Sequence, residues 1–406
     1  MKNFLFMIAG AVLLWGIASC ERPEPAPGPD GPIPPLTLQG VAQLFSSLPL
    51  SSDHIREVKD AVSSSADHGY DEEYMMCDLF GSPGAGVGSD GTASTRASSY
   101  VQPLRDLIRE CLSDRVRTRS GGDSDAAVEA FLDALSDSGM QLYWPFSSSW
   151  DGETLPVITF DPASAALANV GYERVTGPDG SVTVREITVT EDVARRRPVW
   201  VVNVNDDSGF ASLEQLRRQD PDWGKGGRVI VGAAPSATPA PATRGAEEDE
   251  VRTLILKDLK MNDLYESWFL GAAEVMVKCG SVQGFNASTE AELRLYQPTV
   301  TDFMISVKRS QLGQTLPFDA ILISDFQEEL DSFALLLLED DGGTRTSWKV
   351  DASVKYQSKG YGVTLEIPYN QRDDIIWRGS LTNQYFKKYA GEVIHFGGVD
   401  VTFELR

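Results

Sequence analysis

Two pairs of aspartates stand where a β-rich protein could bind a metal ion. Asp206 and Asp207 follow one apolar run, and Asp340 and Asp341 follow another. Each run has the length and composition of a buried strand, so the aspartates are expected on loops at strand ends. Calcium prefers several oxygen ligands, and carboxylates on such loops supply them. Aspartate also favours turns in the same places. The pattern favours turns, with a calcium site at these four residues as the alternative.

The segment 67–78 gathers carboxylates around His68. If the segment is helical, Asp71 and Asp78 lie on one face, and His68 lies within one turn of Asp71 and Glu72. Oxygen and imidazole ligands in this arrangement could bind a cation. The segment lacks the second histidine of the zinc-protease motif. Carboxylates also stabilise the first turn of a helix, and this structural interpretation is preferred.

Catalytic motifs are scarce in this chain. It has 3 histidines, and it contains no Gly-x-Ser-x-Gly motif. Two carboxylates suffice for glycoside hydrolysis, but the 59 acidic residues do not single out a pair. The sequence therefore favours a binding protein over an enzyme. A carboxylate-dependent hydrolase, with its site between the helical and middle domains described below, is the alternative.

Aromatic residues offer a second kind of binding site. Tyr143, Trp144, Phe146 and Trp150 lie close together in the sequence, and aromatic rings stack on sugars or anchor protein interfaces. Packing in a core is the commoner role of such rings. Core packing is therefore the preferred interpretation of this group, and ligand recognition by its rings is the alternative. The expected ligand of the protein is a glycan, a peptide or a protein partner.

The composition limits the classes of function. The chain has 406 residues, 42% of them hydrophobic, which predicts several folded domains rather than a disordered chain. Its 59 acidic residues outnumber the 36 basic ones, and the formal net charge is −23. Nucleic-acid binding needs a basic surface. We therefore expect no nucleic-acid partner.

The start of the chain has the features of an export signal. Lys2 precedes an apolar run over residues 4–17, which is too short to span a bilayer comfortably and leads into Ala18-Ser19-Cys20. Small residues before a cysteine resemble the lipobox of bacterial lipoproteins. The resemblance implies that the signal peptide 1–19 is removed and that the thiol of Cys20 carries the lipid anchor.

Residues 20–35 are rich in proline and form the predicted tether, because repeated prolines favour an extended spacer. This stretch resembles the acidic, proline-rich tethers of Bacteroidota surface lipoproteins. The resemblance implies an outer-membrane location and allows display at the cell surface.

Three patterns divide the next part of the chain. Residues 36–139 repeat apolar positions at helical spacing and predict a small helical domain. Residues 140–232 contain short apolar runs and the hairpin signal Gly177-Pro178-Asp179-Gly180, which predict a β-rich domain. Residues 233–250 combine prolines with four consecutive acids and predict a linker.

Residues 251–406 contain strand-like runs separated by turns, which predict a C-terminal antiparallel β-sandwich. Within them, the stretch 254–279, with Trp268, Gly271 and Glu274, resembles the terminal β domain of an uncharacterised family of exported bacterial proteins. That resemblance implies no activity. The expected fold class is α+β, with several domains in one chain.

The sequence thus predicts a membrane-anchored, extracytoplasmic lipoprotein. Its expected partners are the membrane, through the lipid on Cys20, and a glycan or protein ligand outside the cell. Besides the hydrolase, the alternative is a surface assembly component whose exposed strand edges pair with a partner.

Overall fold

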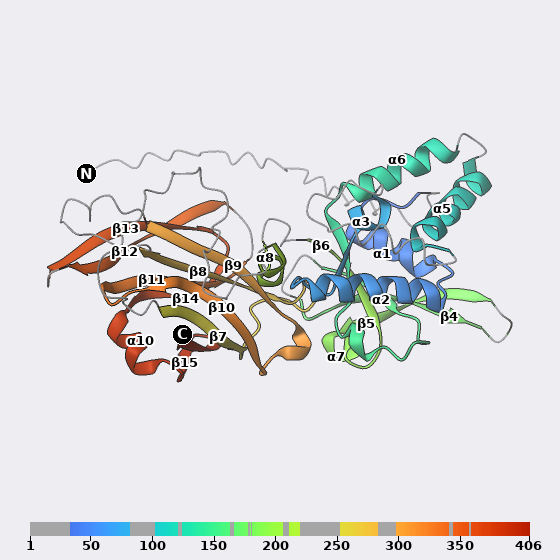
Figure 1. Ribbon diagram of the computed structural model, residues 1–406. Coiled ribbons are helices and arrows are strands. Elements are labelled where there is room, and N and C mark those ends of the chain that lie inside the picture. The colour runs from blue at the N-terminus through green and yellow to red at the C-terminus, as the bar shows by residue number, and fades with distance from the viewer. Residues whose placement is uncertain are drawn as a thin grey trace, which may run out of the picture.

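The computed structural model of the chain is a mixed α+β structure, as the sequence predicts. It contains an N-terminal unit of helices on a sheet and a C-terminal unit of stacked sheets, which lie side by side (Figure 1). The structure describes residues 33–81, 102–120, 124–162, 166–177, 179, 181–205, 211–219, 252–282, 298–340, 344–356 and 359–406. Among these residues, no helix is long and apolar enough to cross a membrane. The predicted signal peptide, most of the tether and the linker lie outside them.

The N-terminal unit contains a six-stranded sheet in the order β1-β2-β6-β3-β4-β5. β3 and β6 run parallel, and the other neighbours are antiparallel. The strands are β1 (Glu73–Met75), β2 (Met140–Tyr143), β3 (Val157–Phe160), β4 (Ala168–Thr176), β5 (Val182–Thr190) and β6 (Val199–Val204). β1 lies in the range predicted as helical, so the sheet takes one of its edges from that range.

One face of this sheet is covered by helices. α1 packs against β3, β4 and β6. The helices are α1 (Leu38–Ser47), α2 (Ser52–Asp67), α3 (Met76–Phe80), α5 (Leu104–Ser120) and α6 (Ser124–Ser136). Helix residues such as Phe45 and Ile108 share one hydrophobic cluster with Trp200 of β6. The predicted helical range and the start of the predicted β-rich range therefore contribute two layers to one core.

Local signals in the sequence coincide with element boundaries. Ser51 precedes α2, and its backbone N–H donates to His54 Nδ1 at 3.0 Å. Gly139 follows α6 with a φ of 67°, a left-handed conformation that glycine adopts without strain. The Gly177 N–H donates to the Ser181 carbonyl at 2.7 Å and closes the predicted hairpin between β4 and β5.

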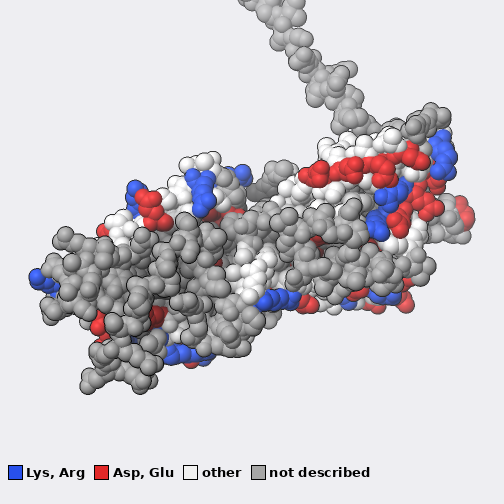
Figure 2. All heavy atoms as spheres, turned by 45° about the horizontal axis from the view of Figure 1, so that its top comes forward, with Lys and Arg blue, Asp and Glu red and all other residues white. Residues whose placement is uncertain are grey.

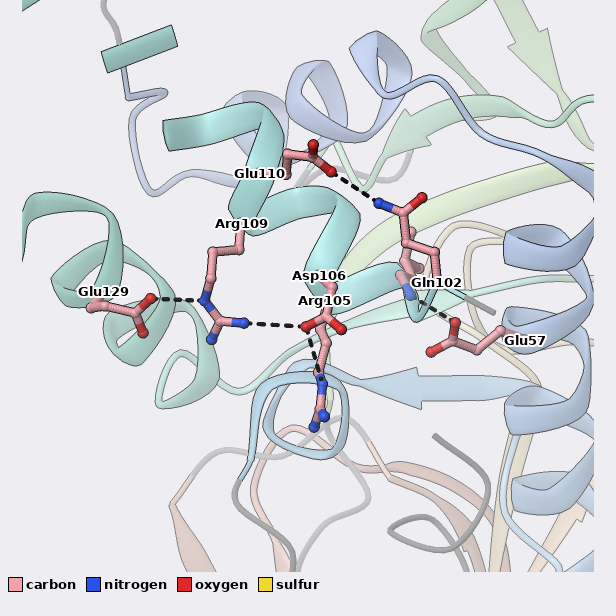
Figure 3. A network of polar contacts seen from close by, with 8 residues as sticks. Glu57, Gln102, Arg105, Asp106, Arg109, Glu110 and Glu129 are labelled. Atoms are coloured by element: carbon pink, nitrogen blue, oxygen red, sulfur yellow. Dashed lines mark hydrogen bonds and ion pairs between the residues drawn. The ribbon is translucent and has the colours of Figure 1, made fainter. Parts of the chain in front are cut away.

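A polar network joins α5 to its neighbours (Figure 3). The Leu104 N–H at the start of α5 donates to Glu57 Oε2 on α2 at 2.7 Å. Glu57 is buried, and burial raises the pKa of its carboxyl. On the outer side, Arg109 donates to Glu129 of α6 at 2.8 Å and lies 3.3 Å from Asp106. The N–H groups in the first turn of a helix have no carbonyl acceptor within that helix, and Glu57 supplies one for Leu104.

The C-terminal unit is an antiparallel β-sandwich, in agreement with the sequence. One sheet has the order β10-β7-β16-β15; in the other, β11 lies between β8 and β14, and β9 pairs with β8. The strands are β7 (Arg252–Met261), β8 (Ala273–Val282), β9 (Pro298–Val307), β10 (Thr315–Phe326), β11 (Leu330–Glu339), β12 (Arg345–Tyr356), β13 (Lys359–Asn370), β14 (Asp374–Thr382), β15 (Val393–Phe396) and β16 (Val399–Leu405). Residues of both sheets and of α10 (Asn383–Tyr389) share one core. The sequence pattern indicates neither β14 nor α10.

The hairpin of β12 and β13 forms a third layer. β12 pairs with β11 near Leu330 and Ser332. β13 lies over β8 and β9 and contacts both strands, but it forms no strand pairing with either of them. Leu365 and Ile367 of β13 pack on Gly280 of β8, where a Cβ would lie 2.9 and 3.2 Å from their terminal methyl groups. The hairpin can approach this closely because position 280 has no side chain. Its packing explains why β8 is buried along its whole length.

A loop of the sandwich packs on the other face of the N-terminal sheet. This junction loop, residues 262–272, connects β7 to β8 and places Trp268 and Phe269 in one apolar cluster with residues of β3, β5 and β6. The Trp268 indole N–H donates to the Leu167 carbonyl at 3.2 Å, and Asn203 Nδ2 donates to the Phe269 carbonyl at 3.1 Å. Two short helices, α7 (Glu191–Ala194) and α8 (Leu213–Gln219), follow β5 and β6 in the chain. The two units therefore share a buried junction.

Acidic side chains form a row over the helical part of the molecule (Figure 2). On α6, Asp125, Glu129 and Asp133 recur every fourth residue and are exposed, so they lie along one outward face. A negative surface of this kind attracts cations and basic partners and repels acidic ones.

Candidate metal centre

Three glutamates meet at one end of the sandwich. Each of Glu266, Glu274 and Glu339 has a carboxylate oxygen within 4.8 Å of the corresponding oxygens of the other two. Glu266 belongs to the junction loop, Glu274 is near the start of β8, and Glu339 ends β11. β8 and β11 are antiparallel neighbours, and Glu339 pairs with Val275, the residue next to Glu274, so both glutamates lie at the same end of the sheet.

Burial distinguishes this group from ordinary surface acids. Glu339 is 0% exposed and Glu274 is 4% exposed, whereas Glu266 is half-buried. Carboxylates out of water repel one another strongly when all are ionised, so such a group is stabilised by a bound cation or by protons. Burial raises the pKa of the adjacent Tyr265 hydroxyl, and neighbouring carboxylates, Glu339 among them, raise it further.

The donor set suits a hard divalent cation. Two oxygens that each lie about 2.4 Å from one calcium ion are at most about 4.8 Å apart, and the three glutamate oxygens satisfy that limit. Carboxylates can bind through one or both oxygens, and water or backbone carbonyls complete a calcium shell. The group contains oxygen ligands alone, which favours calcium, magnesium or manganese over zinc or copper.

Arg309 holds the junction loop beside these glutamates. It is 4% exposed, and its guanidinium donates to the backbone carbonyl of Gly271 at 2.8 Å and to that of Glu266 at 2.9 Å. It also lies 3.8 Å from Glu191 of α7, which belongs to the N-terminal unit. Arg309 is thus a positioning residue for the loop that carries Glu266.

Of the four predicted calcium ligands, the structure describes Asp340. This residue is buried next to Glu339, and its Oδ1 accepts a hydrogen bond from Asn370 Nδ2 at 3.0 Å. Asp373 accepts from the Asn370 backbone N–H at 2.7 Å in the same turn between β13 and β14. Asp340 thus binds the end of β13, and the rest of the turn predicted at 340–343 lies outside the described residues. Asp206, Asp207 and Asp341 lie outside the described residues, as does Cys20.

The prediction that Asp71 and Asp78 share a helical face is wrong. α2 ends at Asp67, and the chain then runs into β1 instead of continuing as a helix. Asp71 Oδ2 instead accepts from the Ala272 N–H of the junction loop at 2.8 Å. A Cβ on Gly271 would lie 2.6 Å from this oxygen, so the loop needs glycine there.

The neighbouring acids of this segment also bind within the N-terminal unit. Glu72 accepts from the Ser147 hydroxyl at 2.7 Å, and burial raises its pKa. Glu73 accepts from Asn205 Nδ2 at 2.9 Å. The carboxylates of residues 71–73 therefore accept hydrogen bonds from protein groups, and their role is structural.

Two members of the predicted aromatic group lie in the core, and the other two, Phe146 and Trp150, are half-buried against it. Tyr143 and Trp144 are each 1% exposed. The Trp144 ring meets those of Trp150 and Trp200 edge to face, with centroids 5.8 Å apart in each case. The Trp150 indole N–H donates to the Thr154 carbonyl at 2.9 Å. These rings therefore stabilise the N-terminal unit, which is the interpretation that the sequence favours.

Sequence reasoning missed the three glutamates as a group. Glu339 ends the run of four leucines in β11, and a carboxylate at the end of so apolar a strand is a usable signal. Comparison of the chain with protein-family models, with curated proteins and with solved structures finds no match.

Proposed function

We propose that this protein is a lipid-anchored, extracytoplasmic binding protein whose sandwich domain holds a divalent cation of the calcium class. The observation that carries the cation site is the convergence of Glu266, Glu274 and Glu339 from three separate segments. The lipobox-like start and the proline-rich tether support the anchor and the location. The acidic surface suits a protein that works outside the membrane among cations.

The cation has a structural role in this proposal. It links the junction loop, through Glu266, to the ends of two central strands of the sandwich. The same loop carries Trp268 and Phe269 into the N-terminal sheet. Cation binding therefore stiffens the connection between the two units, and it does so without a catalytic step. In this proposal the glycan, peptide or protein ligand binds at another place on the protein, and the cation keeps the two units in position.

Calcium is expected to raise the melting temperature of the protein by several degrees relative to EDTA. A ligand at 100 times its Kd stabilises the native state by about 2.7 kcal/mol, which in a chain of this size is a shift of a few degrees. Calorimetric melts and isothermal titration with calcium and with magnesium measure it. Calcium is expected to bind more tightly than magnesium, because magnesium gives up its water reluctantly.

Glu339→Gln is expected to abolish the calcium shift. In EDTA this variant is expected to melt no lower than the native protein, because one of three mutually repelling charges is gone. Glu366→Gln is the matched control, since Glu366 is exposed on β13 and pairs with Lys349 at 2.8 Å. A native protein that melts at the same temperature in calcium and in EDTA, with no heat of binding, rules out the cation site.

The lipid anchor is tested separately. Cys20→Ser is expected to move the protein from the membrane fraction to the soluble fraction and to abolish its labelling with a fatty acid, because the thiol is the acylated group. Cys77→Ser is the control, since Cys77 is an exposed free thiol. Retention of the Cys20→Ser variant in the membrane fraction, with undiminished labelling, contradicts the lipoprotein assignment.

A further inference from the structure

β5 is a long strand at the end of the N-terminal sheet. In the part of the chain that the structure describes, its nine residues pair with β4 on one side and with no strand on the other. Residues 182–186 and Thr188 are exposed. The β4–β5 hairpin projects from the body of the molecule at the right of Figure 1. An edge of this kind presents a row of backbone N–H and C=O groups to any extended chain that approaches it.

Several other described edges of the three sheets have a feature that discourages pairing. β1 and β15 have three and four residues. β9 begins with Pro298, β10 contains Pro317, and β13 contains Pro368. The pairing of β14 with β11 has a register shift. Short length, proline and irregular register are the usual ways in which proteins protect an edge.

β5 has none of these features. Its nine register pairs with β4 are consecutive, without a bulge, and the strand contains neither proline nor lysine. Its sequence, VTVREITVT, is rich in the β-branched residues that favour strands. Arg185 and Glu186 are the only charged residues of this strand, and its edge is otherwise regular over nine residues, which suits it to pair with a further strand.

The side chains of β5 indicate what kind of segment fits. Val182 and Val184 are 46% and 44% exposed, on the face of the sheet where the helices lie. Arg185 is already paired with Glu173 of β4 at 2.5 Å. Glu186, at the centre of the strand, is exposed and forms no ion pair with the residues that the structure describes. A partner strand is therefore favoured if it places apolar residues beside the valines and a basic residue beside Glu186.

We propose that the free edge of β5 binds an extended segment of a partner protein by strand addition, with β-branched or apolar side chains beside Val182 and Val184 and a lysine or arginine beside Glu186. Main-chain hydrogen bonds supply the affinity, and the alternate side chains supply the selectivity. This surface is remote in sequence from the three glutamates. It deepens the proposed binding function, on which it rests, by naming an extended protein segment as the ligand.

The probe is a synthetic nine-residue peptide of alternating valine and threonine with a central lysine. Fluorescence anisotropy is expected to show saturable binding to the full chain, and hydrogen exchange is expected to slow in residues 182–188. N-methylation of the alternate amides that face β5 is expected to weaken binding at least about tenfold, because the main-chain bonds are lost. A central glutamate is expected to weaken it by about threefold, through repulsion by Glu186.

The double variant Val182→Lys, Val184→Lys is expected to lose binding of the lysine peptide. Both residues are exposed, so the fold tolerates lysine, and a circular dichroism melt checks this. Val393→Lys on β15 is the control, since Val393 is 69% exposed at another edge. Three results overturn the proposal: no binding at millimolar peptide, equal binding of the N-methylated peptide, or equal loss in the control. Self-association that the double variant abolishes assigns the edge instead to a second copy of the chain.

Discussion

Replacing Trp268 by alanine is expected to lower the free energy of unfolding by about 3–5 kcal/mol, the usual cost of deleting a buried tryptophan side chain. Trp268 is 2% exposed and packs with Phe269 in the cluster on the N-terminal sheet. Its indole N–H also donates to the Leu167 carbonyl. Alanine leaves a cavity between the two units and removes that donor, so both units lose stability together.

Calorimetry distinguishes this effect from damage to the sandwich alone. Trp268→Ala is expected to lower the melting temperature on the order of 10 °C and to affect the unfolding of both units. Trp348→Ala is the matched control, because Trp348 is a half-buried tryptophan of β12 on the outer face of the sandwich. Its loss is expected to cost less and to leave the N-terminal unit unchanged. If Trp268→Ala melts like the native protein, the junction does not couple the units.

The parts of the fold that follow from local sequence were predictable. The helices α2, α5 and α6 repeat apolar residues at helical spacing, and the strands of the sandwich contain apolar runs of the right length. The turn between β4 and β5 follows from its glycines. β14 was not predictable in this way, because its residues combine Trp377 and Arg378 with Gly379 and form no long apolar run.

The junction and the glutamate group follow from contacts between distant residues. Asp71 binds the N–H of Ala272, and Trp268 binds the carbonyl of Leu167. Neither contact has a signature in the neighbouring sequence. The acidic segment 67–78 was recognised as unusual, but its chemistry depends on β1, which the helical pattern around it conceals. The three glutamates come from a loop and two strands that are far apart in the chain, and a single sequence does not reveal that they meet.

The junction loop explains why the unusual residues gather in one stretch of the chain. Trp268 fills the gap on the N-terminal sheet, Gly271 leaves room for the Asp71 carboxylate, and Glu274 faces the other two glutamates. All three lie within residues 254–279. In this structure they join two units, which is a role that requires particular residues without requiring catalysis.

Arg309→Met is expected to lower the free energy of unfolding by about 2–4 kcal/mol, the second large effect at the junction. The guanidinium is 4% exposed and donates to two backbone carbonyls of the junction loop. Methionine fills much of the same volume but donates no hydrogen bond, so two buried acceptors lose their donor. Arg309→Lys is expected to recover part of the loss, because one ammonium cannot reproduce the planar fork that spans both carbonyls.

Arg195→Met is the matched control for this prediction, because Arg195 pairs with the same Glu191 at 2.6 Å from an exposed position on the surface. Its expected effect is within about 0.5 kcal/mol, as is usual for exposed ion pairs. Urea unfolding of the three variants measures the differences.

Equal losses for Arg309→Met and Arg195→Met would mean that the ion pair with Glu191 matters and the bonds to the loop do not. The structure indicates the reverse, since the Arg309–Glu191 distance is 3.8 Å while both carbonyl contacts are shorter than 3 Å. Arg309 therefore stabilises the protein by holding the junction loop in place.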